Sequence, residues 1–175
     1  AQKQKVKMGG NRNGEITHYS LEVIQDSGAY PKWGAILPGS TLMMASGVYQ
    51  IPNVEFSSRS VATTTAPVCA YRGAGRPEAT SVIERTVDLF ARKIDMDPAK
   101  VRRLNFPNRE EFPFRNSTGT VYDSGDYEGA LDKALNAIDY EEIRSEQNRR
   151  RDANERLQLG IGISCLLYTS DAADD

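Results

Sequence analysis

The chain has 175 residues, of which 39% are hydrophobic and 26% are charged, and its formal net charge is −2 at pH 7. This length allows one domain with a hydrophobic core, and the balanced charge excludes a general attraction to nucleic acid or to anionic membranes. No apolar run reaches the length of a membrane span, and the polar N-terminus lacks a signal-peptide pattern. Two cysteines, Cys69 and Cys165, are too few for a disulfide framework or an iron–sulfur cluster, so we expect a reducing, cytoplasmic setting.

The first half of the sequence is typical of strands, because hydrophobic and β-branched residues alternate with polar ones in three runs. Asn13-Gly14 separates the first two runs and favours a hairpin turn. A segment rich in Gly and Pro, 26–39, predicts a loop before the third run. The predicted strands are 3–8, 15–25 and 54–65, and a single helical turn is predicted over 42–45.

The second half is typical of helices. Apolar residues recur at steps of three and four from Ala79 to Ile94, which predicts a helix with one buried stripe. Asp97 before Pro98 predicts the N-cap and first residue of a second helix. Two more helices are predicted: one is capped by Asp126 and has the inner face Tyr127, Leu131, Leu135 and Ile138; the other is charged, starts at a capping box of Asp139 with Glu142, and lies on the surface to about Asn154.

Strands followed by helices predict an α+β fold. The chain ends in an emerging strand over 157–163 and then in residues 165–175, which match nothing before them. We interpret 165–175 as a non-native tail derived from a sequencing adapter, and 1–164 as the native part, with the origin of Cys165 left open. A tail of that origin is expected to be dispensable for stability.

The segment Tyr71-Arg72-Gly73-Ala74-Gly75-Arg76 lies between the third strand and the first long helix. Gly73 and Gly75 allow positive φ and a close approach of the backbone, and Pro77 suits the first turn of a helix. The unpaired N–H groups of a helix start favour an anion, and Arg72 and Arg76 add positive charge. The pattern therefore predicts a turn that faces an anionic or oxygen-rich group, although such a turn is also common as a simple connection.

These residues, followed by Pro-Glu-Ala, resemble the active-site loop of the molybdenum hydroxylases: xanthine dehydrogenase, aldehyde oxidase and the carbon monoxide dehydrogenase large subunit, here closest to the form II group. The resemblance covers about 3–164 and implies an internal fragment of a larger subunit. Four further motifs occur in the order known from that family: Asp26-Ser27-Gly28-Ala29-Tyr30, Gly47-Val48-Tyr49-Gln50-Ile51-Pro52-Asn53, Arg103-Leu104-Asn105-Phe106 and Tyr122-Asp123-Ser124-Gly125-Asp126-Tyr127.

The resemblance implies a partial molybdopterin-binding domain of the aldehyde oxidase and xanthine dehydrogenase type. It implies a molybdopterin dinucleotide cofactor with molybdenum, in the cytosine form that bacteria use, and partner subunits that carry an iron–sulfur cluster and FAD. The residues implied to contact this cofactor and to shape the substrate pocket are Tyr71, Arg72, Gly73, Ala74, Gly75 and Arg76. No protein ligand to a metal is implied, because the pterin dithiolene holds the molybdenum.

The catalytic glutamate of the family lies near the C-terminal end of the full subunit, so the resemblance places no catalytic residue in this chain and implies that the fragment alone is inactive. Glu78 is close to the loop, but a carboxylate in a first helical turn more often complements the helix dipole than acts as a base. His18 is the only histidine, and without a second ligand nearby it favours a surface position over metal binding.

The loop departs from two branches of the family. Carbon monoxide dehydrogenases of the copper–molybdenum type carry a cysteine where this chain has Gly73. A thiolate is the kind of ligand that selects Cu(I), and glycine cannot supply it. Purine hydroxylases carry a loop phenylalanine and an earlier arginine where this chain has Ala74-Gly75 and Ser40-Thr41-Leu42. The resemblance, with these two departures, therefore implies a subunit that hydroxylates aldehydes or N-heterocycles. The alternatives are a carbon monoxide dehydrogenase subunit, or a non-catalytic structural or interaction domain with the same fold.

Overall fold

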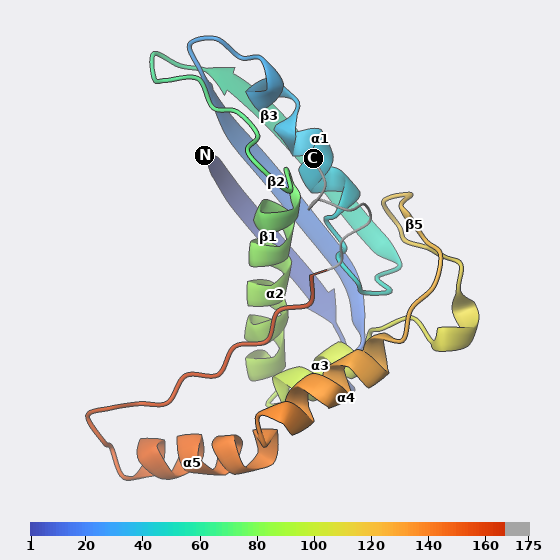
Figure 1. Cartoon of the computed structure of the whole chain (residues 1–175), viewed down its shortest axis with the longest axis vertical. Helices are drawn as coiled ribbons and strands as arrows, with labels where there is room; N and C mark the ends of the chain where they lie inside the picture. The colour runs from blue at the N-terminus through green and yellow to red at the C-terminus, as the bar shows by residue number, and fades with distance from the viewer. Residues whose placement is uncertain (167–175) are drawn as a thin grey trace.

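Three strands form the main sheet of the computed structural model, which describes residues 1–166 (Figure 1). They are β1 (Gln2–Gly10), β2 (Ile16–Gly28) and β3 (Asn53–Ala62), in the order β1-β2-β3. β1 and β2 form an antiparallel hairpin, with Val6 opposite Leu21, whereas β3 runs parallel to β2, with Phe56 opposite Leu21. The three predicted strands are confirmed, but the parallel pairing of β3 was not predicted.

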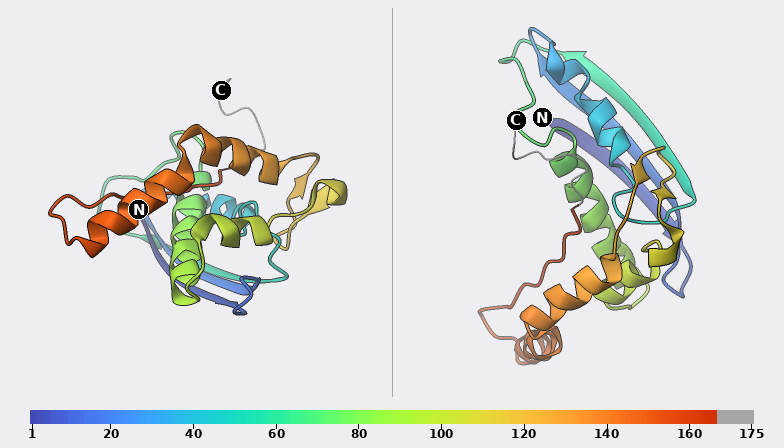
Figure 2. Two further views of the ribbon diagram at one scale, coloured as in Figure 1. Left: turned by 90° about the horizontal axis from the view of Figure 1, so that it is seen from below. Right: turned by 45° about the vertical axis from the view of Figure 1, so that its right-hand side comes forward.

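Helices cover only one face of this sheet (Figure 2). The parallel crossover from β2 to β3 contains the 3₁₀ turn η1 (Trp33–Ala35) and the helix α1 (Leu37–Met43), and the long helix α2 (Arg76–Lys93) lies beside them. Tyr19, Leu21 and Val23 of β2 are at most 1% exposed and pack with Ile83 and Val87 of α2. Because side chains alternate across a strand, the neighbouring residues of β2 face solvent on the other side.

The remaining elements gather at one end of the sheet, and α5 projects away from it (Figure 1). Asn105 joins these elements to the hairpin: its side chain accepts a hydrogen bond from the Ile16 amide at 2.8 Å and donates to the Gly14 carbonyl at 2.8 Å. The remaining elements are α3 (Pro98–Leu104), η2 (Arg109–Glu111), β4 (Phe114–Arg115), β5 (Val121–Tyr122), α4 (Tyr127–Ala137) and α5 (Tyr140–Asp152). Strands come first and helices mainly after them, which confirms the α+β prediction.

Several local predictions were wrong. The short helix α1 begins at Leu37, earlier than the predicted turn over 42–45. Asp139 forms no capping box, because it adopts φ 49° and its side chain makes no cap hydrogen bond. Ile138 does not join the inner face of α4, since it is 46% exposed at the C-cap. Residues 157–163 form no strand, and run as irregular chain back from α5 towards α2 (Figure 1).

The predicted N-caps Asp97 and Asp126 are confirmed. Oδ1 of Asp97 accepts hydrogen bonds from the amides of Ala99 at 2.8 Å and Lys100 at 3.1 Å, and Oδ2 accepts one from the Tyr140 hydroxyl at 2.9 Å. Asp97 therefore fixes the start of α3 and also connects it to α5.

We expect Asp97→Ala to lower the free energy of unfolding by about 1–2 kcal/mol, because it removes a helix cap. Asp139→Asn is the matched control, since Asp139 caps nothing and asparagine tolerates positive φ. Urea unfolding of both variants measures the difference. Equal losses would show that the Asp97 cap contributes nothing to stability.

Of the proposed tail, 165–175, residues 167–175 lie outside the part of the chain that the structure describes. Cys165 itself is partly buried against the hydrophobic core, and burial raises the pKa of its thiol to about 11. We therefore propose that the folded part continues at least to Cys165. Within the described residues, no helix is long and apolar enough to cross a membrane.

Candidate functional site

The glycine turn before α2 is fixed by contact with α1. Gly75 adopts φ 83°, and a Cβ atom on it would lie 2.3 Å from the Ser40 carbonyl carbon and 2.6 Å from the Thr41 nitrogen. Gly73 adopts φ 64°, but a Cβ atom there would meet nothing within 4 Å. The two glycines thus have different roles: Gly75 allows two backbones to touch, and Gly73 allows only the turn itself.

The segment that leads into the turn is held by the Asp26-Ser27-Gly28 motif. Oδ1 of Asp26 accepts hydrogen bonds from the Thr63 hydroxyl at 2.7 Å and from the Gly28 amide at 3.0 Å. These hydrogen bonds hold the pKa of Asp26 below its usual range, and the one from Thr63 has the largest effect. The Val68 amide donates to the Ser27 carbonyl at 3.4 Å. The end of β2 therefore fixes the path of the chain between β3 and the loop.

A cavity of about 200 Å³ lies between the loop, the sheet and the start of α2. Gln2 and Gln25 line it from β1 and β2, and Leu37 lines it from α1. A volume of this size accepts a small ring but is below the usual range for a drug-sized ligand. The other lining residues are Ala1, Val68, Cys69, Ala70, Tyr71, Arg72, Ala74, Pro77 and Glu78.

Hydrogen bonds place the polar wall of this cavity. Nε2 of Gln4 donates to the Glu78 carbonyl at 3.2 Å and to Oε1 of Gln2 at 2.9 Å, and Nε2 of Gln2 donates to Oγ1 of Thr41 at 3.0 Å. β1 is thus joined to the first turn of α2 and to α1. Two acceptors near this wall, Oε1 of Gln25 and Oε2 of Glu78, are buried and have no hydrogen-bond partner.

The six loop residues that the sequence singled out occupy different environments. Tyr71, Arg72 and Ala74 line the cavity, with Tyr71 and Arg72 exposed. Gly73 and Gly75 shape the turn, and Arg76 is the first, half-buried residue of α2. The structure therefore brings three of the six together in one cavity and uses the other three to form the turn and the helix start.

The sequence did not lead us to expect that the sheet contributes residues to the cavity. Gln25 was expected only as part of a strand, and Gln2 was not considered. A signal for Gln25 existed, because it is a polar residue on the buried side of an alternating strand, where it is 1% exposed. Glu78 was interpreted as helix-start chemistry, and it does lie in the first turn of α2, but it also lines the cavity.

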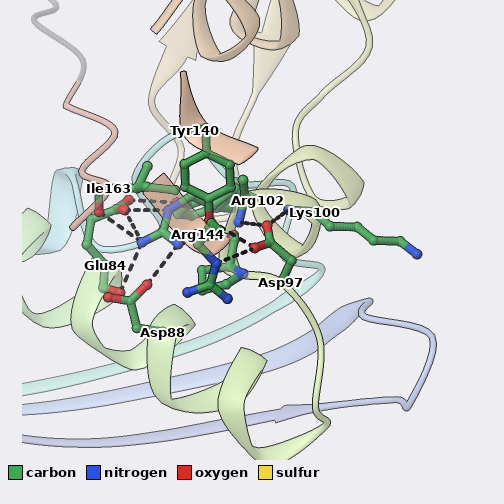
Figure 3. A network of polar contacts seen from close by, with 11 residues as sticks. Glu84, Asp88, Asp97, Lys100, Arg102, Tyr140, Arg144 and Ile163 are labelled. Carbon is green, nitrogen blue, oxygen red and sulfur yellow. Dashed lines mark hydrogen bonds and ion pairs between the residues drawn. The ribbon is translucent and has the colours of Figure 1, made fainter. Parts of the chain in front are cut away.

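A buried ion-pair network fixes the middle of α2 (Figure 3). Arg102 of α3 is 0% exposed and donates to Oε2 of Glu84 from Nε at 3.0 Å and from Nη2 at 2.8 Å. It also pairs with Asp88 at 2.9 Å and donates to the Ile163 carbonyl at 3.0 Å. The other carboxylate oxygen of Glu84, Oε1, accepts a hydrogen bond from the Tyr49 hydroxyl at 2.7 Å. One guanidinium thus connects α2, α3 and the segment after α5.

His18 is exposed on β2, as the sequence favoured, and its ring contacts Thr17. The residues that the structure describes contain no group of three or more His, Cys, Asp or Glu that could hold a metal ion.

Residues 1–106 match the protein family described as the molybdopterin cofactor-binding domain. The chain belongs to this family. The matched residues include the sheet, the loop and the cavity described above. The resemblance inferred from the loop motifs is therefore confirmed.

Named relatives agree with this assignment. The chain is 40% identical over 156 residues to the carbon monoxide dehydrogenase large chain of Hydrogenophaga pseudoflava, covering 86% of this chain and 19% of that protein. It is 32% identical over 162 residues to the nicotine 6-hydroxylase large subunit of Paenarthrobacter nicotinovorans, covering 90% and 20%. The structure resembles that of a copper- and molybdenum-containing carbon monoxide dehydrogenase with a TM-score of 0.80 at 29% identity, covering 89% and 20%.

The chain therefore spans about a fifth of the length of the relatives that it matches. Those relatives are oxidoreductase subunits, and this chain corresponds to one section of such a subunit. The cavity of about 200 Å³ is too small to enclose a dinucleotide cofactor. Parts of a subunit outside the described residues must complete any cofactor site.

Proposed function

We propose that the chain forms part of a molybdenum hydroxylase subunit that oxidises aldehydes or N-heterocycles, with Tyr71 to Arg76 shaping the substrate pocket. The observation that carries this proposal is the cavity beside the glycine turn, within the residues that match the molybdopterin-binding family. Three residues of the loop, Tyr71, Arg72 and Ala74, line this cavity.

The residues present fit a molybdopterin cofactor in their chemistry. When bound, the cofactor supplies the redox chemistry, while the protein supplies position and electrostatics. The turn around Gly73 leaves its backbone open, since nothing lies within 4 Å of a Cβ position there. Arg72 at the cavity offers a fixed positive charge for an anionic centre. These features orient and stabilise a ligand, and a general base would have to come from outside this chain.

The finer assignments follow from the same proposal. We propose a molybdopterin dinucleotide in the cytosine form, and partner subunits that carry an iron–sulfur cluster and FAD. Two relatives are named as a large chain and a large subunit, which supports a complex of several subunits. We further propose that the complex works in the cytoplasm.

Carbon monoxide dehydrogenase is a second candidate, because two relatives carry that name, at 40% and 32% identity. A copper site needs a soft ligand such as a thiolate, and this chain has Gly73 at the loop position where a cysteine would serve. Cys69 lines the same cavity but lies before the turn and is exposed. Oxidation of aldehydes or N-heterocycles therefore fits the loop better.

Purification of the intact subunit with its partners tests this proposal. We expect stoichiometric molybdenum and pterin, measured by metal analysis and by fluorescence of the oxidised pterin, and dye reduction with a panel of aldehydes and N-heterocycles. An intact complex that lacks molybdenum would favour the non-catalytic alternative. Dye reduction with carbon monoxide alone would favour the second candidate.

A further inference from the structure

The face of the sheet that no described helix covers carries an excess of positive charge (Figure 2). Val6, Leu21 and Phe56 lie side by side on the three strands and face the core, so their neighbours along each strand point to the other side. These neighbours form three rows across the sheet, which we call the open face: Lys3–Ile24–Arg59, Lys5–Glu22–Ser57 and Lys7–Ser20–Glu55. The open face has four cations and two carboxylates, whereas the whole chain has a net charge of −2.

Little in the chain neutralises these cations. Nζ of Lys5 and Oε2 of Glu22 are 4.0 Å apart, with side chains 74% and 54% exposed, and such a pair contributes little. The next outward residue of β2, Asp26, turns its carboxylate to the Thr63 hydroxyl instead. The other three cations form no ion pair among residues 1–166: Lys3, Lys7 and Arg59. The positive excess therefore remains available to a partner.

The composition of the open face selects an acidic protein surface as that partner. A cation can be covered only where a carboxylate or another anion compensates its lost hydration. Glu22 and Glu55 lie among the cations, and a continuous array of phosphates, as in nucleic acid or an anionic membrane, would repel both. A protein can place a cation opposite each of them. Ile24 is 40% exposed in its row between two cations, and an apolar centre with charges around it is typical of a protein interface.

The source of this surface follows from the same residues. Lysine is rarely buried inside a folded chain, which disfavours a further section of the same subunit as the cover. Separate subunits meet after folding, and opposite charges then steer their encounter. We propose that the open face docks an acidic surface of a partner subunit. This inference rests on the proposed function, which includes partner subunits, and adds the surface on which one of them binds.

The test measures association of the intact subunit with its partner subunits by biolayer interferometry at about 50 and about 300 mM salt, where the screening of charges differs. A first variant replaces three lysines by glutamate, which reverses their charge and keeps β1 a charged edge: Lys3, Lys5 and Lys7. A second variant replaces the same lysines by arginine and keeps the charge. The control replaces three other exposed lysines by glutamate, with an equal change in net charge: Lys32, Lys100 and Lys133.

Arg59→Glu is a single change on the same face, and it is needed because a glutamate at position 5 would lie opposite Glu22. Arg59 lies on β3 opposite Ile24, so its reversal sets no like charge directly across the strands. Melting temperature, molybdenum content and turnover are measured for every variant. If the glutamate triple variant melts lower than wild type, Arg59→Glu decides.

We expect the glutamate triple variant to associate about tenfold or more slowly at low salt, with its dissociation rate within about threefold of wild type, because charges around an interface act mainly on the encounter. Arg59→Glu should slow association in the same way. The arginine variant and the control should stay within about twofold of wild type. Added salt should slow association of the wild type more than that of the glutamate variants.

Unchanged association of both open-face variants, an equal loss in the control, or an intact subunit that binds no partner would overturn the inference. Binding of the wild type to phosphatidylserine vesicles or duplex DNA, lost in the glutamate variants while subunit association is unchanged, would also overturn it. Self-association of the glutamate triple variant with unchanged partner binding would assign the lysines to protection of the β1 edge alone. A complex that assembles with the expected charge dependence but lacks molybdenum and turnover would contradict the proposed function and leave this inference unaffected.

Discussion

Gly75→Ala should destabilise the protein by about 2–5 kcal/mol, through backbone strain at positive φ and overpacking against a neighbour. The added Cβ atom would lie 2.3 Å from the carbonyl carbon of Ser40, and a backbone atom of a helix cannot move aside as a flexible side chain can. The helix α1 and the loop would have to separate. Since the loop and α1 both line the cavity, this separation also changes the candidate site.

Gly73→Ala is the matched control. Gly73 also has positive φ, 64°, but no atom lies within 4 Å of its Cβ position. This variant should lose only about 1–2 kcal/mol, the cost of a left-handed conformation for a residue with a Cβ atom. Denaturant unfolding of both variants isolates the contact with α1. Equal destabilisation would mean that this contact contributes nothing.

Gly75→Val tests whether the same contact is needed for activity. In the intact enzyme we expect it to abolish turnover, because a β-branched side chain enlarges the clash with Ser40 and Thr41, while α2 after Pro77 keeps its helical structure. Circular dichroism and molybdenum content accompany the assay. Wild-type turnover by this variant would show that the loop is only a connection between β3 and α2.

Arg102→Met should lower the free energy of unfolding by about 3–5 kcal/mol, because it leaves Glu84 as a buried carboxylate without its cation. Glu84 keeps only the hydrogen bond from Tyr49 as a side-chain partner among those described above. Adding Glu84→Leu in the same chain should recover much of the loss, since an apolar pair of similar volume often replaces a buried ion pair at little cost. A double variant no more stable than Arg102→Met would contradict this explanation.

The stability lost in Arg102→Met should also depend on pH. Burial already raises the pKa of Glu84, and Arg102 and Tyr49 oppose that shift; removing Arg102 raises it further. A raised folded-state pKa means that the folded protein binds a proton more readily than the unfolded chain, so stability falls as pH rises above the ordinary glutamate value. The difference between wild type and Arg102→Met should therefore be largest at neutral pH and should shrink towards pH 4. A difference that does not change with pH would contradict this assignment.

Local patterns predicted most of the elements but few of the contacts between them. Alternation found all three strands of the main sheet, and side-chain chemistry found the caps at Asp97 and Asp126, because both depend on neighbours in sequence. The same reasoning failed at Asp139, where the turn between α4 and α5 forces positive φ and removes the capping geometry. Short patterns do not show which residue of a turn takes that conformation.

The contacts that form the site are distant in sequence, and this is why they were missed. Gly75 was expected to need positive φ, which is confirmed, but its contact with Ser40 joins residues 35 positions apart. Because β3 runs parallel to β2, the segment that follows β3 passes back over α1. This brings Gly75 against Ser40. Gln25 and Glu78 likewise meet at one cavity only after the sheet and α2 have packed. A single sequence carries no direct signal for such pairs.

The order β1-β2-β3 leaves two strands paired on one side only within the described residues, and these two edges are unequal. Lys3, Lys5 and Lys7 are exposed on β1, and lysine on an edge strand discourages pairing with another chain. β3 has no lysine, and most of its residues are exposed and small or polar. With two charged residues, Glu55 and Arg59, against the three lysines of β1, β3 is the less protected edge. We expect any edge-to-edge association of isolated chains to use β3, and an added lysine on β3 to reduce it.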